Sequence, residues 1–154
     1  MKLTMALAAL AALAGCAKNL TTDTRSSAFA TTDEKLAFLR RYVELRTPVE
    51  RAEFHIDYQD NSGGCLGPAG PSDWDSVIAL KIAPADVAAW TKDLALERDA
   101  ESLDWMKDVP LDGAAWARSS AARVYHVRLH DRLVVFAPEG ILYLFTSTTG
   151  RSAQ

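Results

Sequence analysis

The sequence has no cluster of Lys and Arg residues, and its formal net charge is −3. An acidic chain without a basic cluster makes a poor nucleic-acid binder, so we expect no nucleic acid among its partners. The Ala/Leu-rich run over residues 3–15 is too short for a membrane-spanning helix, which needs about 20 residues. Because 49% of the residues are hydrophobic and four are Trp, the chain can build a core, and we expect disorder only at its ends.

The sequence also lacks the spacings that are typical of phosphate and metal sites. Residues 63–71 hold four Gly and two Pro, which specify a particular backbone path, but no Lys follows in the phosphate-loop spacing. Four aspartates could gather a hard cation such as calcium, yet the Asp-x-Asp-x-Asp-Gly spacing is absent; they are Asp57, Asp60, Asp73 and Asp75. We interpret residues 60–75 as a structured surface loop whose polar side chains bond its own turns. We expect no metal and no cofactor.

The N-terminus carries the pattern of a secretory signal. One charge, Lys2, precedes the apolar run, and residues 13–16 read Leu-Ala-Gly-Cys. This short segment resembles the lipobox of bacterial lipoprotein precursors, over residues 1–16 only. The resemblance implies cleavage before Cys16, lipidation of Cys16, and anchoring to a membrane of the bacterial cell envelope. Ala17 rather than Asp after the cysteine implies the outer membrane, with the domain facing the periplasm. The alternative is an ordinary signal peptide that happens to contain Cys16.

These features divide the chain into four parts. We expect a signal peptide over 1–15, a lipidated N-terminus and tether over 16–31, one domain over 32–147, and a disordered tail over 148–154. A lipidated Cys16 cannot form a disulfide, which leaves Cys65 alone. Cys65 can be a buried thiol, an intermolecular disulfide partner, or a nucleophile that uses a histidine as its base. The candidate bases are His55, His126 and His130.

Hydrophobic periodicity predicts the elements of the domain. Thr31 and Glu34 form a capping box for a helix over 32–45. Strands are expected over 51–58, 76–82, 123–129, 133–136 and 141–145, a helix over 84–94, and a short helical piece around 103–106. The first strand should bury Ala52, Phe54, Ile56 and Tyr58 and leave Glu53, His55 and Asp57 in water. In the strand over 123–129, Tyr125, Val127 and Leu129 should point inward, and His126 and Arg128 outward. His126 and His130 would then be about 13 Å apart, too far to share a zinc ion.

The predicted fold is α+β, with a mainly antiparallel sheet of about five strands and two or three helices packed on one face. The function that we predict is a lipid-anchored, non-catalytic binding module of the cell envelope. It would meet a protein partner as an inhibitor, immunity factor or accessory subunit does. The predicted partner-binding residues are Trp74, Asp60, Asn61, Ser62, Asp73, Asp75 and His55, with Trp74 as the aromatic anchor. The alternative is a small envelope enzyme that uses Cys65 or the acidic 57–75 segment.

Overall fold

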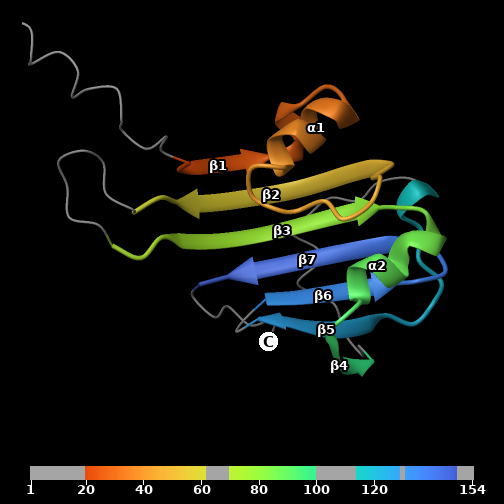
Figure 1. The fold of residues 1–154 in the computed structure, drawn as a ribbon. Helices are drawn as coiled ribbons and strands as arrows, with labels where there is room; N and C mark the ends of the chain where they lie inside the picture. The colour runs from red at the N-terminus through yellow and green to blue at the C-terminus, as the bar shows by residue number, and fades with distance from the viewer. Residues whose placement is uncertain (1–19, 62–69, 100–113, 129–130, 149–154) are drawn as a thin grey trace, which may run out of the picture.

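The computed structural model describes residues 20–61, 70–99, 114–128 and 131–148. These residues form one antiparallel sheet of seven strands in the order β1-β2-β3-β7-β6-β5-β4 (Figure 1). The strands are β1 Thr22–Arg25, β2 Arg51–Gln59, β3 Asp73–Lys81, β4 Ala95–Asp99, β5 Arg123–Arg128, β6 Asp131–Phe136 and β7 Ile141–Ser147. The helices are α1 Thr32–Leu39 and α2 Val87–Thr91, with 3₁₀ turns at Ser26–Ala28, Pro84–Asp86 and Ala114–Trp116.

The mainly antiparallel sheet is confirmed, but the expected number of about five strands is wrong. The described residues are mostly sheet, with only two short α-helices in place of the predicted helical layer of two or three helices. The two additional strands, β1 and β4, are the edges of the sheet. Their sequences, TDTR and ALERD, show no apolar alternation, because an edge strand is held by backbone pairing and buries few side chains. Residues 22–31, which the sequence analysis assigned to the tether, therefore belong to the fold. Thr148, expected in the tail, bonds the backbone of Trp74.

Several predicted features lie outside the described residues. These are the signal peptide, Cys16, Ser62, Cys65, the helical piece around 103–106, Leu129, His130 and residues 149–154.

The two α-helices are shorter than expected. The predicted capping box of α1 is present: Thr31 Oγ1 accepts the Glu34 N–H at 3.2 Å, and the Glu34 carboxylate accepts the Thr31 N–H at 3.0 Å. The helix ends at Leu39 rather than at residue 45, because the next residues tighten into a turn in which the Tyr42 N–H donates to the Leu39 carbonyl. In the second helical segment a 3₁₀ turn begins at Pro84, and only five residues form α2.

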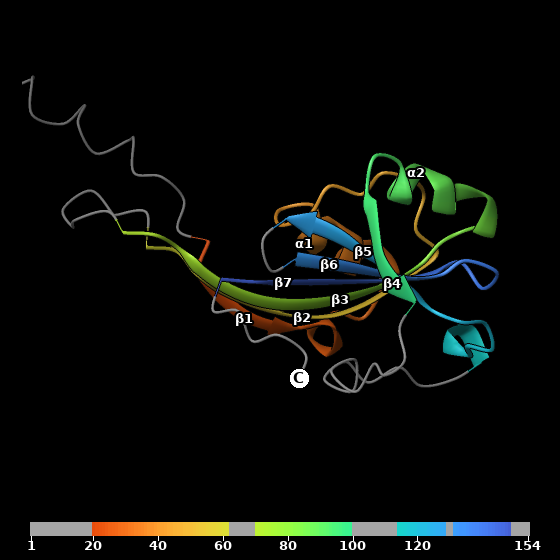
Figure 2. The same cartoon turned by 90° about the horizontal axis from the view of Figure 1, so that it is seen from below.

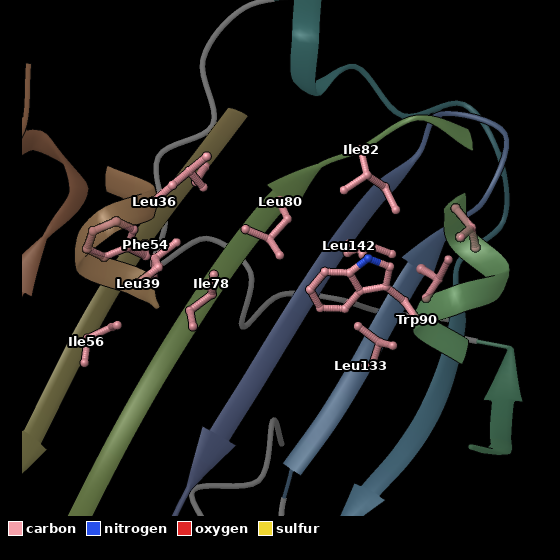
Figure 3. Close-up of a cluster of buried hydrophobic side chains, with 13 residues drawn as sticks. Leu36, Leu39, Phe54, Ile56, Ile78, Leu80, Ile82, Trp90, Leu133 and Leu142 are labelled. Carbon is pink, nitrogen blue, oxygen red and sulfur yellow. The ribbon is translucent and has the colours of Figure 1, made fainter. Parts of the chain in front are cut away.

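Both helices contribute to one core cluster (Figure 3). Leu36 and Leu39 of α1 and Val87 and Trp90 of α2 join strand residues there. The strand members include Phe54, Ile56, Ile78, Leu80, Leu133 and Leu142. As predicted, β2 alternates between this core and a more exposed row that contains Glu53, His55 and Asp57. Figure 1 shows both helices toward the C-terminal end of β3, so they leave the other end of this face uncovered.

The opposite face of the central strands is also apolar, which the sequence analysis did not predict. A second buried cluster contains Val77, Ala79, Val134, Phe136, Ile141, Tyr143, Phe145 and Trp116, among others. In Figure 2, α2 and the turn around Trp116 lie on opposite sides of the sheet. The central strands thus have two buried faces, and their near-continuous apolar runs are typical of such strands. This face is more solvated along β1, β2 and the start of β3.

Glu139 fastens the turn between β6 and β7. Its carboxylate accepts the backbone N–H groups of Ser119 and Ser120, both at 2.8 Å, and both serine hydroxyls. The bond from the Ser120 hydroxyl, with the three others, lowers the pKa of Glu139 from 4.5 to about 2. The ionised carboxylate is therefore the form that holds residues 119–120 against the turn.

This lowered pKa predicts a pH-dependent contribution to stability. Glu139 stabilises the fold fully above pH 4.5, and that contribution is lost as the pH falls toward about 2. The difference in free energy of unfolding between wild type and Glu139→Gln should therefore shrink across this window in urea titrations. Ser120→Ala, which removes one of the four bonds, should show the same trend more weakly. A difference that stays constant from pH 6 to pH 2 would contradict the assignment.

Candidate functional site

A run of aromatic side chains leads from the core to the surface. Phe54, which is 2% exposed, stacks on Phe38 at 5.4 Å between ring centroids. Phe38 contacts Tyr42 at 5.1 Å, Tyr42 contacts Tyr58 at 5.9 Å, and Tyr58 stacks on Trp74 at 6.4 Å. The buried end fixes the exposed end, because each ring is held by the preceding one. The last three rings are half-buried and therefore available for contact.

These last three rings line a cleft of about 300 Å³ on the same face as the helices. We call it the aromatic cleft. Tyr42, Tyr58 and Trp74 line it together with Arg41 and Arg128, and its remaining lining includes Ile56, Ile78, Leu144, Ser76 and Thr146. Leu20, the first described residue, also lines it. Trp74 and Ser76 place the cleft at the N-terminal end of β3. Figure 1 shows that the two helices lie toward the other end of this strand.

Arg128 reaches the cleft because of an irregularity in β5. His126 pairs with Arg132 and Arg128 pairs with Asp131, so Val127 is an extra residue between two pairs. Such a bulge turns the next side chain to the other face of the sheet. The expected inward Val127 and outward Arg128 are therefore wrong: Val127 is 40% exposed, and the Arg128 guanidinium lies 6.0 Å from the centroid of the Trp74 ring.

The charged residues among the described lining of the aromatic cleft are both arginines. Arg128 Nε donates to the carboxylate of Asp131 at 2.7 Å, and that carboxyl side chain is only 6% exposed. Arg41 stacks over the rings of Phe38 and Tyr42 at 5.2 and 5.4 Å and pairs with no carboxylate of the described residues. No Asp or Glu is among the described residues that line the cleft. Because Asp131 pairs with Arg128, the positive charge of Arg41 is the one that no described lining residue balances.

Trp74 lies in a strand and not in the loop where the sequence analysis put it. It pairs with Tyr58, and both side chains point to the helix-covered face. The side chains of Asp73 and Asp75, and of His55 on β2, point to the opposite face of the sheet. Of the predicted partner-binding residues on β2 and β3, Trp74 is thus on one face of the sheet, and His55, Asp73 and Asp75 are on the other.

Asp60 and Asn61, which follow β2, bond to residues 20–21 and 70–71 respectively. Asp60 Oδ2 accepts the Leu20 N–H at 3.1 Å, and the Asp60 N–H donates to Thr21 Oγ1 at 2.9 Å. Asn61 Nδ2 donates to the Pro71 carbonyl at 3.0 Å, and the Asn61 carbonyl accepts the Gly70 N–H at 2.7 Å. The bonds of Asn61 lie within the segment, as the interpretation of residues 60–75 predicts, whereas those of Asp60 tie the end of β2 to residues 20–21. They give both residues a structural role beside the cleft.

The acidic residues of the opposite face form a cross-strand row. Asp23, Asp57 and Asp75 lie directly opposite one another on β1, β2 and β3. His55 Nε2 lies 2.8 Å from Asp23 Oδ1. Within the part of the chain that the structure describes, no group of three His, Cys, Asp or Glu side chains could hold a metal ion. Asp57, which was predicted to be in a strand, lies in β2, and Asp73 and Asp75, which were expected in a loop, lie in β3.

The aromatic and charged residues that line the cleft beside Trp74 were not among the predicted site residues. They are Arg41, Tyr42, Tyr58 and Arg128. Tyr58 was predicted to point inward, and Trp74, Ser76 and Ile78 continue the same period-two pattern on the adjacent strand. Extending that strand back by three residues would have placed Trp74 beside Tyr58. No pattern indicated Arg128, because strict alternation assigns it to the other face.

In comparisons with known proteins, no protein-family model, no curated protein and no solved structure matches this chain. Among the described residues, no helix has the length and apolar character needed to cross a membrane.

Proposed function

We propose that this chain is a lipid-anchored binding module of the bacterial cell envelope that holds a protein partner at the aromatic cleft. Cys16 carries the lipid, and the domain faces the periplasm from the outer membrane. The module acts by occupancy, as an inhibitor, immunity factor or accessory subunit does, and performs no reaction itself.

The observation that carries the proposal is the composition of the cleft. Tyr, Trp and Arg are the residues that most often dominate the binding energy of protein interfaces, and Tyr42, Tyr58, Trp74, Arg41 and Arg128 surround a single preformed cavity. The aromatic rings are stacked on the core, so little side-chain entropy is lost when a partner binds. The Tyr58 hydroxyl and the Trp74 indole N–H can bond a partner while the ring faces bury apolar area.

The anchor is tested by replacing its cysteine. Cys16→Ser should abolish labelling with radioactive palmitate, because it removes the thiol that would carry the lipid. It should also release the protein from the membrane fraction, because stable anchoring needs two or more acyl chains. Cys65→Ser is the matched control, since it removes the other cysteine and should leave labelling unchanged. Equal labelling of Cys16→Ser and wild type would overturn the anchor without affecting the cleft.

The cleft is tested through Trp74. A photoreactive phenylalanine analogue at position 74 should cross-link the partner in intact cells, and the same analogue at position 55, on the opposite face, should not. With the partner identified, we expect Trp74→Ala to weaken its binding by about 2 kcal/mol, roughly 30-fold in Kd. The domain should stay folded, because the half-buried Trp74 should cost less than the roughly 3–5 kcal/mol of a fully buried aromatic.

His55→Ala is the control for this measurement. It removes the contact with Asp23 but leaves the cleft unchanged, so the Kd should stay within about twofold of wild type. A larger loss in His55→Ala than in Trp74→Ala would move the binding surface to the acidic face and overturn the proposal.

A further inference from the structure

We infer that the aromatic cleft selects a partner segment in which a carboxylate lies next to an aromatic or large apolar side chain. The inference rests on the proposed function and names the chemistry that the partner must present. It follows from the charge, the free donors and the size of the cleft.

The charge of the cleft opposes that of the whole molecule. The chain has 20 acidic against 17 basic residues, and yet the described lining of the cleft contains two arginines and no acid. Asp131 forms an ion pair with Arg128, and Arg41 forms none with a carboxylate of the described residues. A bound carboxylate would restore the balance at this point, whereas a bound Lys or Arg would add a like charge.

The arginines also have donors available in a defined geometry. The guanidinium has five N–H donors in a planar fork, and Asp131 engages only Nε of Arg128. The guanidinium lies 6.0 Å from the centroid of the Trp74 ring, and the bond to Asp131 restrains its position while the Nη donors remain available to a ligand. Arg41 lies over two rings and contacts the Tyr42 hydroxyl at 3.4 Å. Oriented guanidinium groups of this kind suit the two oxygens of a carboxylate.

The size and floor of the cleft favour a protein segment over a membrane lipid. A volume of about 300 Å³ lies at the lower end of the range for ligand sites and suits one or two side chains. The floor has apolar patches at Ile56, Ile78 and Leu144 but also the hydroxyl-bearing residues Ser76 and Thr146. An apolar side chain fits against the rings and the apolar patches, while a pair of acyl chains would exceed the cavity and cover polar groups.

The inference is tested by selecting ligands without prior choice. Random heptapeptides displayed on phage are selected against the detergent-solubilised full chain, and the enriched sequences are read. We expect Asp or Glu within two positions of Phe, Tyr, Trp or Leu. The Kd of the best synthetic peptide should rise about tenfold in Arg41→Glu, because a charge-assisted bond is lost. It should rise by a smaller factor in Arg128→Lys, which keeps the charge but loses the planar fork.

Arg25→Glu is the matched control, since Arg25 is exposed on β1 and does not line the cleft; the Kd should stay within about twofold. Failure to enrich any peptide, enrichment of neutral or basic peptides, or an unchanged Kd in Arg41→Glu would overturn the inference. Displacement of the peptide by soluble dihexanoyl phosphatidylglycerol, but not by the phosphatidylcholine, would overturn it in favour of an anionic lipid. If Trp74→Ala still weakens binding of the cross-linked partner while Arg41→Glu does not, the proposed function stands and this inference alone fails.

Discussion

Replacing Trp90 by alanine is expected to lower the free energy of unfolding by about 3–5 kcal/mol, the usual cost for a large buried aromatic. Trp90 is only 2% exposed and extends from α2 over Leu142 and Leu133 (Figure 3). Because α2 has five residues, it is too short to be stable by itself and depends on such packing. The loss should appear as a lower urea midpoint, followed by circular dichroism.

Trp90 also ties the segment before β2 to the helix. Its indole N–H donates to Thr47 Oγ1 at 2.8 Å, and its carbonyl accepts an N–H of Arg46 at 3.1 Å. Thr47→Val removes the first bond and keeps the ring, so it should cost about 1–2 kcal/mol. The comparison separates burial from hydrogen bonding. If Trp90→Ala costs no more than Thr47→Val, the ring does not support α2 as described.

Replacing Gly140 by alanine is the second change with a large expected effect. Gly140 has a φ of 63°, and a Cβ atom there would lie 2.2 Å from the Ile82 carbonyl oxygen. The left-handed conformation costs an alanine about 1–2 kcal/mol. The clash must also move the backbone at Ile82, whose N–H donates to the Gly140 carbonyl at 2.9 Å. We expect a total loss of about 2–4 kcal/mol.

Gly70 provides the matched control for Gly140. A Cβ atom at Gly70 would meet nothing closer than Asn61 Cβ at 3.8 Å, and the glycine does not have a positive φ. Gly70→Ala should therefore be neutral or stabilise by about 0.4–1 kcal/mol, through the lower entropy of the unfolded chain. Equal effects of the two substitutions on the urea midpoint would show that the turn at Gly140 can relax.

The parts of the fold that the sequence predicts are those where side-chain burial decides the conformation. The alternation of Ala52, Phe54 and Ile56 against Glu53 and His55 predicts β2 with its correct faces. The capping box at Thr31 and Glu34 predicts where α1 begins from four neighbouring residues. Such signals are local, so they can be read from neighbouring residues alone.

The two edge strands and the first three residues of β3 could not be predicted in this way. Asp73 and Asp75 have low strand propensity, but pairing with Gln59 and Asp57 on β2 places them in the sheet. The residues of β1 are ordered by the same kind of backbone pairing. Tertiary pairing therefore overrides the local preference at both sites, and Trp74 moves from an expected loop to a strand.

The candidate site was predicted in one residue and missed in its arrangement. Trp74 was predicted as a contact residue, and its neighbours were taken from the adjacent sequence and not from the adjacent strands. Tyr58 and Arg128 become neighbours of Trp74 only through strand pairing and through the bulge at Val127. A single inserted residue changes which face Arg128 serves, and no sequence pattern records that insertion.

The bonds at Leu20 have a mechanical consequence. Its N–H is held by Asp60 and its carbonyl by the Tyr42 hydroxyl, and its side chain lines the aromatic cleft. A pulling force on the N-terminus of the domain would therefore load these two bonds before it reached the ladder between β1 and β2. The Tyr42 ring is a wall of the cleft, so the force would reach the cleft directly. Tension on the chain and the shape of the aromatic cleft are thus coupled through Leu20.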